Sequence, residues 1–224
     1  METLFDNSTT KRRVMIAVNV LSLIVLGVMV QTGGTYLVNA AVICFGEGGP
    51  MSAGTSWIGS FARTAADQYA LYIQSVKAMG SREYVYAMIF APLIEEIVFR
   101  LIFLRAGKMI MPFWAANLVQ AVLFGLYHTM TIQKIYAFIL GLIIGCVFHY
   151  CPIIYRRAYE TDVPASILGV AMTFVFHVVI NSAGLFVLPL FPANIPIAAQ
   201  YVTGFVLMIA AVAVCFILRK RSRG

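Results

Sequence analysis

The run IYAFILGLIIGCVFHY, residues 135–150, decides the fold class of this chain. It contains no Asp, Glu, Lys or Arg, and as a helix it covers about 24 Å of a hydrocarbon layer that is about 30 Å thick. The whole chain is 61% hydrophobic and only 11% charged, with a mean hydropathy of +0.89, which is unlike a soluble domain. We therefore predict an all-α, polytopic transmembrane helix bundle of about six spans. The other five apolar runs are 14–30, 85–104, 113–130, 166–188 and 197–218.

The net charge of +7 comes from basic clusters that flank the apolar runs. Residues 11–13 precede the first run and the basic segment 219–223 follows the last. Basic residues beside spans mark the cytoplasmic side, so six spans place both termini in the cytoplasm. We divide the chain into a cytoplasmic tail (1–13), one transmembrane domain (14–218) and a basic cytoplasmic tail (219–224). This pattern predicts contact with the lipid bilayer and no nucleic-acid partner.

Residues 31–83 are harder to interpret than the rest of the chain. The apolar stretch 35–45 is short for a span and is followed by GEGGP, residues 46–50, a strong turn signal. Residues 57–79 mix aromatic and charged side chains, which predicts an amphipathic helix at the membrane surface. We expect a re-entrant or interfacial segment here. An additional pair of short spans, giving eight in total, is the alternative.

Three charged residues lie near the centre of the apolar run 85–104. Ionisable groups inside a bilayer cost roughly 2.5–3.5 kcal/mol each on insertion scales, so they usually face a cavity and have a function. Glu96 and Arg100 are four residues apart and share a helix face, which predicts an ion pair. Glu95 is rotated by about 100° from Glu96. The spacing therefore leaves Glu95 as the carboxylate available for chemistry.

All three histidines fall within predicted spans, but His149 lies at a span end and is assigned no role. His128 lies near the end of one apolar run, while His177 and Asn181 occupy one face of another at a spacing of four residues. An isolated intramembrane histidine is often a packing residue that bonds a neighbouring helix. Two histidines with Asn181 and Glu95, on separate helices, favour a functional site instead.

These residues form three ordered motifs: Glu95-Glu96-x-x-x-Arg100, Phe124-x-x-x-His128 and His177-x-x-x-Asn181. Because all three motifs occur in this order, the chain resembles the CAAX-protease and bacteriocin-processing (Abi) family of intramembrane endopeptidases. The motif region covers residues 92–184, and the chain as a whole resembles the compact prokaryotic members in length. The resemblance implies an intramembrane peptidase of a prokaryotic cell membrane, whose substrate is a peptide or a membrane protein.

By the same resemblance, Glu95 and His128 would orient and deprotonate the hydrolytic water. His177 and Asn181 would bind the oxyanion of the tetrahedral intermediate, and Glu96–Arg100 would hold the helix in register. Histidines and glutamates could also bind Zn²⁺. The chain has no HExxH motif, however, and we expect a metal-free mechanism, with Zn²⁺ as the alternative.

Two other classes of function fit the same residues. A non-catalytic immunity or regulatory protein could use this fold to bind a peptide. A proton-coupled transporter could use Glu95, Glu96, Arg100 and His128 as a proton relay, although the sequence shows no inverted repeat.

Overall fold

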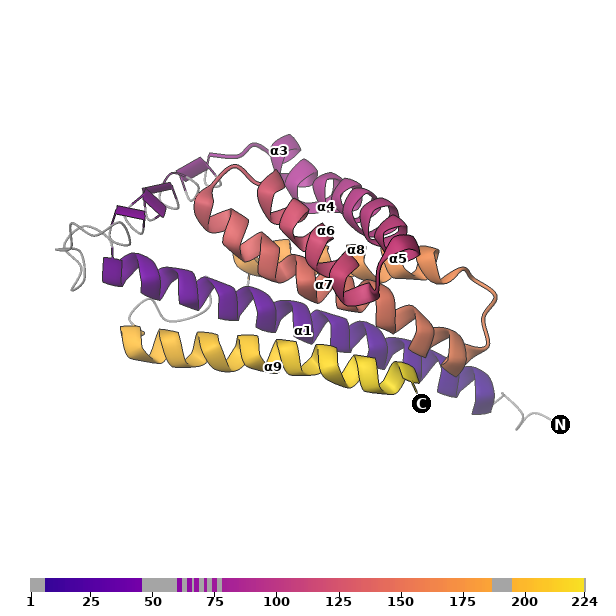
Figure 1. Cartoon of the computed structure of the whole chain (residues 1–224). Helices are drawn as coiled ribbons and strands as arrows, with labels where there is room; N and C mark the ends of the chain where they lie inside the picture. The colour runs from indigo at the N-terminus through magenta and orange to yellow at the C-terminus, as the bar shows by residue number, and fades with distance from the viewer. Residues whose placement is uncertain are drawn as a thin grey trace.

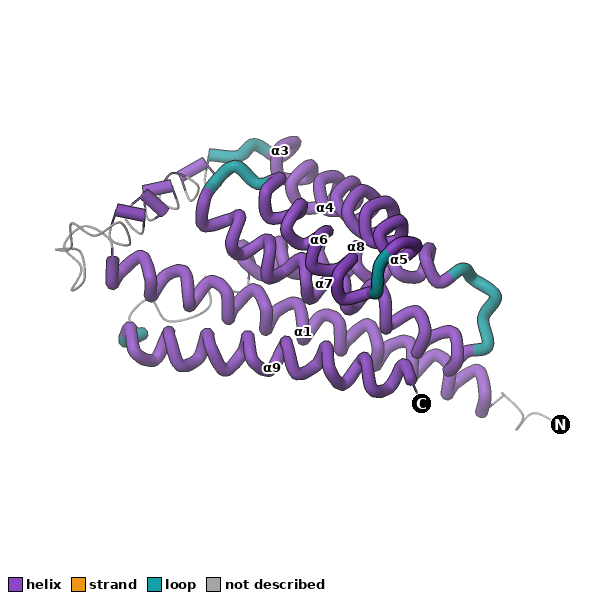
Figure 2. Tube along the Cα trace, viewed as in Figure 1, coloured by secondary structure: helices purple, strands orange, loops and turns teal. Residues whose placement is uncertain are grey.

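The computed structural model describes residues 7–45, 78–186 and 195–223, together with scattered positions between 60 and 75. Every regular element among these residues is a helix (Figure 1), so the predicted all-α class is confirmed for this part of the chain. Figure 2 shows that loops between neighbouring described helices are short. In chain order, with η for π-helical segments, the elements are α1 (Asn7–Phe45), α3 (Ser81–Val85), η1 (Tyr86–Phe90), α4 (Ala91–Glu95), η2 (Glu96–Leu104), α5 (Arg105–Ile110), α6 (Phe113–Tyr127), α7 (Thr131–Tyr159), α8 (Ala165–Phe186) and α9 (Ile197–Arg223).

Four of the described helices are long and apolar enough to cross a membrane: Ala17–Ala41 within α1, Thr131–Tyr159, Ala165–Gly184 and Ile197–Arg223. The chain is thus a membrane protein. The predicted run 113–130 forms α6, which has only 15 residues. The predicted run 85–104 lies in a helix of mixed α and π geometry. Because α6 is short and the run 85–104 is divided between α and π segments, the predicted count of about six is not confirmed.

The first helix corrects the prediction of a separate re-entrant segment at 35–45. α1 is one continuous helix of 39 residues that includes this stretch. The small, polar segment around Gly33 resembles a span end in sequence, yet in the bundle it is a contact surface. A Cβ atom on Gly33 would lie 3.2 Å from the carbonyl oxygen of Gly204 on α9, so the absence of side chains allows the two helices to approach closely.

The predicted amphipathic helix at 57–79 falls mostly outside the described residues. Its described positions between 60 and 75 are helical. One of them, Gln68, accepts a hydrogen bond from the backbone N–H of Thr131 at 2.7 Å, and so satisfies a donor at the start of α7.

Residues 81–110, the composite helix, form one continuous helix in which α and π segments alternate. The junction residues Tyr86, Ala91, Glu96 and Arg105 all have right-handed helical backbone angles, and the helix ends only at the extended Met111. π-Helical turns add one residue per hydrogen-bonded ring and are common at functional sites. Here they change the angular positions of the side chains that the composite helix presents to α6 and α8.

The helices pack with their axes roughly along the bundle. α1 and α9 lie side by side and antiparallel, α7 and α8 pack against this pair, and α6 and the composite helix lie beyond α7 and α8 (Figure 1). α6 is joined to α7 by a buried amide pair: Gln120 Nε2 donates to Asn117 Oδ1 at 2.7 Å and to the Gly141 carbonyl at 2.9 Å. Such polar contacts between spans stabilise helix association in a bilayer.

Most basic positions gather at one end of the bundle. α1 begins and α9 ends there, at the right of Figure 1, next to α5 and the end of α7. These elements carry the basic positions 11–13, 105, 108, 156, 157, 219–221 and 223. The opposite end holds the beginning of the composite helix and the loop between α6 and α7 (Figure 1).

Candidate active site

The centre of the site is His177 of α8, which contacts two neighbouring glutamates of the composite helix. Its Nδ1 lies 2.8 Å from Glu96 Oε1, and its Nε2 lies 3.6 Å from Glu95 Oε2. The residues are adjacent in sequence, but Glu95 ends α4 and Glu96 begins η2. The imidazole can therefore reach one carboxylate with each ring nitrogen.

Glu96 is fully buried and forms the predicted ion pair with Arg100. Arg100 Nε lies 3.3 Å from Glu96 Oε2, and both side chains have no exposed surface. The Arg100 guanidinium also lies over the ring of Phe124 on α6, 4.4 Å from its centroid, an arrangement that favours a cation. Both Glu96 oxygens are thus close to a charged or hydrogen-bonding group.

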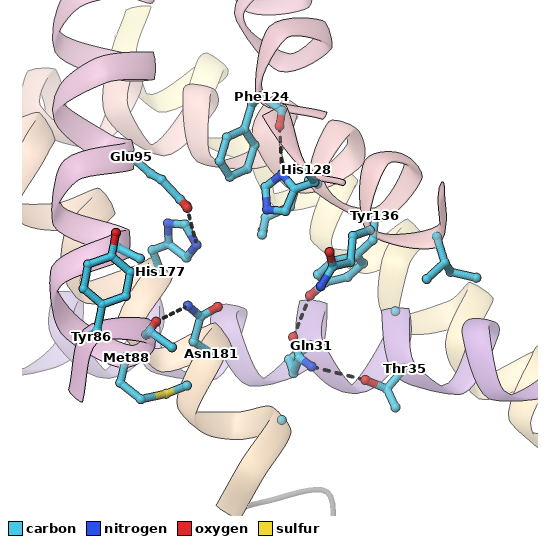
Figure 3. Close-up of a pocket in the computed structure, with 18 of the residues that line it drawn as sticks. Gln31, Thr35, Tyr86, Met88, Glu95, Phe124, His128, Tyr136, His177 and Asn181 are labelled. Carbon is cyan, nitrogen blue, oxygen red and sulfur yellow. Dashed lines mark hydrogen bonds and ion pairs between the residues drawn. The ribbon is translucent and has the colours of Figure 1, made fainter. Parts of the chain in front are cut away.

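Glu95 has a different environment. Its side chain remains 13% exposed and lines a cavity that Glu96 does not reach. In Figure 3 its carboxylate lies beside His177 at the edge of this cavity. The division that the spacing suggests, with Glu96 in an ion pair and Glu95 open to a reactant, matches this geometry.

Asn181 lies one helical turn after His177 and is held by the backbone of the composite helix. Its Nδ2 donates to the Ala87 carbonyl oxygen at 3.2 Å. The Ala91 N–H donates to the carbonyl of Tyr86, five residues earlier in the chain. The next bond of this pattern would run from residue 92 to the Ala87 carbonyl, but residue 92 is a proline and has no N–H. Asn181 thus satisfies a carbonyl that Pro92 leaves free. A carboxamide has two N–H donors, so the second remains for the cavity.

His128 follows the last residue of α6 and has an extended backbone that turns the chain towards α7. Its Nδ1 lies 2.9 Å from the Phe124 carbonyl oxygen, which requires the Nδ1–H tautomer or the protonated ring. This bond fixes the ring with Nε2 as the remaining functional nitrogen. His128 also lines the cavity, on the wall formed by α6 (Figure 3).

Glu95, His128, His177 and Asn181 therefore line one cavity of about 740 Å³. The composite helix, α6 and α8 provide these four residues, and α1 and α7 form the remaining wall. Residues 82 and 83, exposed at the start of the composite helix, also line it, so the cavity extends to the end of the bundle away from the basic clusters.

Residues 81–183 match the family described as Type II CAAX prenyl endopeptidase Rce1-like. The match covers a little under half of the chain and includes every residue of the three motifs. The match supports the CAAX-protease family for this part of the chain. No curated protein and no solved structure matches the chain. The resemblance inferred from the motifs is thus confirmed, while the catalytic roles of the residues stay predictions.

The donor set does not form a metal site of the usual kind. In the described ranges, no three His, Cys, Asp or Glu side chains converge as ligands of one ion. Zinc sites in proteins have three or four such ligands at about 2.0–2.3 Å. Glu95 and His177 approach each other, but His128 is directed by its bond to Phe124. The mechanism proposed below therefore uses side-chain groups only.

The sequence did not indicate two features of this candidate site. One is the contact between His177 Nε2 and Glu95 Oε2 at 3.6 Å. The other is the presence of Gln31 and Tyr136, whose side chains lie across the cavity from Glu95 (Figure 3). A polar residue within an apolar run, such as Gln31, was the available signal, and it was interpreted as a span end.

Proposed function

We propose that the chain is an intramembrane endopeptidase in which Glu95 activates the hydrolytic water. One observation carries the proposal: Glu95 reaches the cavity, while the adjacent Glu96 is held by Arg100 and His177. A carboxylate that is available to a reactant beside two histidines can act as a general base.

In the proposed reaction, Glu95 takes a proton from water while His128 Nε2 orients it. The oxygen attacks the carbonyl carbon of the scissile peptide bond and forms a tetrahedral oxyanion. The second N–H of Asn181 stabilises this oxyanion, and protonated His177, whose Nδ1–H donates to Glu96, offers its Nε2–H. The C–N bond then breaks as the protonated Glu95 returns its proton to the leaving amine.

The cavity wall is consistent with a peptide or membrane-protein segment as substrate. Apolar side chains such as Met88, Ile132 and Leu140 line the cavity together with a smaller number of polar groups, as is usual in ligand pockets. The family description names prenyl endopeptidases, so a prenylated cysteine peptide is one candidate within this class. Binding without cleavage would instead support the immunity or regulatory function.

Asn181→Ala tests the oxyanion role. We expect kcat to fall by about 10²–10³-fold, since one oxyanion donor is lost. The variant also leaves the Ala87 carbonyl without its partner, which costs about 1 kcal/mol of stability. Cleavage of short, internally quenched peptides by protein in nanodiscs measures the rate, and SDS titration in mixed micelles measures the stability.

A double variant separates these two effects. In Pro92→Ala/Asn181→Ala the new backbone N–H can bond to Ala87, so we expect stability to recover while kcat stays low. Recovery of kcat in the double variant would show that Asn181 acts only through the helix. Ser182→Ala, at the neighbouring position, serves as the control with unchanged kcat.

We also propose that both termini are cytoplasmic and that the cavity opens to the opposite side of the membrane. The basic clusters mark the cytoplasmic end. Residues 82 and 83, which line the cavity, lie at the other end (Figure 1). Substrate would then enter from outside the cytoplasm.

Cysteine labelling tests this orientation in right-side-out membrane vesicles. All four native cysteines are first replaced by serine. We expect a membrane-impermeant maleimide to label Glu83→Cys directly, and Arg157→Cys only after the vesicles are permeabilised. The reverse pattern would place the cavity mouth in the cytoplasm.

A further inference from the structure

A hydrogen-bonded group of polar side chains lies on the cavity wall that faces the proposed catalytic residues. Tyr136 Oη of α7 donates to Gln31 Oε1 of α1 at 2.7 Å, and Gln31 Nε2 lies 3.2 Å from Thr35 Oγ1. In Figure 3 these three side chains lie across from Glu95 and His177, with Asn181 and His128 between. We call Gln31, Thr35 and Tyr136 the amide shelf.

Two glycines make room for the amide shelf. A Cβ on Gly184 of α8 would lie 2.8 Å from Gln31 Nε2, and a Cβ on Gly34 would overlap the ring of Tyr136. Side chains at either position would displace one member of the hydrogen-bonded pair. The shelf is therefore supported by α1, α7 and α8 together, and the bond to Tyr136 fixes which atoms of Gln31 face the cavity.

The amide shelf differs from a polar contact that merely joins helices. Asn117 and Gln120 are a contact of the latter kind: they join α6 to α7, and their exposed fractions are 0% and 1%. Gln31, Thr35 and Tyr136 are each only partly buried, and all three line the cavity. In a bilayer, polar groups kept open to a cavity usually contact a substrate.

We propose that the amide shelf binds the peptide backbone of the substrate, beside the scissile bond; this rests on the proposed peptidase function. Gln31 Oε1 accepts the hydrogen bond from Tyr136, and one of the two Nε2–H groups donates to Thr35. The second Nε2–H can therefore donate to a carbonyl of the substrate. The shelf has no charged member, so it fits a neutral amide rather than a carboxylate. Hydrogen bonds on opposite walls would hold an extended peptide with its scissile carbonyl at Asn181.

The shelf also extends beyond the segment matched by the family. Gln31 and Thr35 belong to α1, whereas the match begins at residue 81. Two of the three shelf residues thus come from outside the matched segment, while Tyr136 lies within it. The amide shelf would hold the substrate backbone, whereas the catalytic groups of the matched segment would carry out the hydrolysis.

Gln31→Leu and Tyr136→Phe test the proposal with short, internally quenched peptides, with and without a farnesylated cysteine. We expect each variant to raise KM by about 3- to 10-fold, the effect of one lost hydrogen bond, while kcat changes little. Gln120→Leu is the matched control: it removes a buried amide outside the cavity, so it should lower stability and leave KM unchanged. A wild-type KM in both shelf variants overturns the proposal.

Binding measured separately from cleavage distinguishes the two hypotheses. Fluorescence polarisation gives the affinity for the same peptides without turnover. If the wild type binds a peptide but does not cleave it, the peptidase function fails, and the shelf is judged by whether Gln31→Leu weakens that binding. A chain that neither binds nor cleaves any of these peptides overturns both.

Discussion

Glu95→Gln is expected to reduce peptide cleavage by about 10²–10⁴-fold, the usual contribution of a general base. The carboxamide keeps the size of the carboxylate, but it cannot accept a proton from water or return one to the leaving amine. Because Glu95 is partly exposed to the cavity and forms no ion pair with Arg100, the unfolding transition should remain close to that of the wild type. Initial rates with internally quenched peptides, together with SDS titration, check both statements.

Glu83→Gln is the appropriate control. It makes the same change on the same composite helix, at an exposed position near the cavity mouth. We expect its rate to stay close to wild type. If Glu95→Gln also cleaved at the wild-type rate, Glu95 would not be the base, and the proposed mechanism would fail with it.

The sequence predicted the fold class well because a bilayer imposes a simple rule. Each backbone polar group must be satisfied within the segment, so long apolar runs such as 135–150 form helices. The length of the first helix, α1, was harder to predict from the sequence. Gly33 and its polar neighbours interrupt the apolar pattern, yet Gln31 bonds to Tyr136 of α7, Gly33 packs closely against α9, and α1 continues to Phe45. Such compensation comes from other helices and leaves no signal in the local sequence.

The candidate site shows the same limit. Motif spacing predicted which residues meet, and Glu95, His128, His177 and Asn181 do line one cavity. It did not predict their partners, because these depend on the π-helical turns of the composite helix. An α-helical wheel separates Glu95 and Glu96 by about 100°, whereas His177 contacts both. Likewise, the bond from Asn181 to Ala87 depends on the position of Pro92, which no motif includes.

Glu96→Gln and Arg100→Met, made singly, should each lower the free energy of unfolding by about 3–5 kcal/mol, the cost of leaving one partner of a buried ion pair uncompensated. Both side chains have no exposed surface, so water cannot replace the lost charge. SDS titration in mixed micelles measures this loss. Arg82→Met, an exposed arginine on the same helix, should cost little and serves as the control.

The double variant Glu96→Leu/Arg100→Met separates stability from function. Removing both charges also removes their desolvation cost, so we expect much of the lost stability to return. Cleavage should stay low, because His177 Nδ1 then has no carboxylate at 2.8 Å to orient the ring. If the double variant cleaved peptides at the wild-type rate, the pair would contribute only to stability. If it stayed as unstable as the single variants, the buried pair would be essential to the packing of the composite helix against α6 and α8.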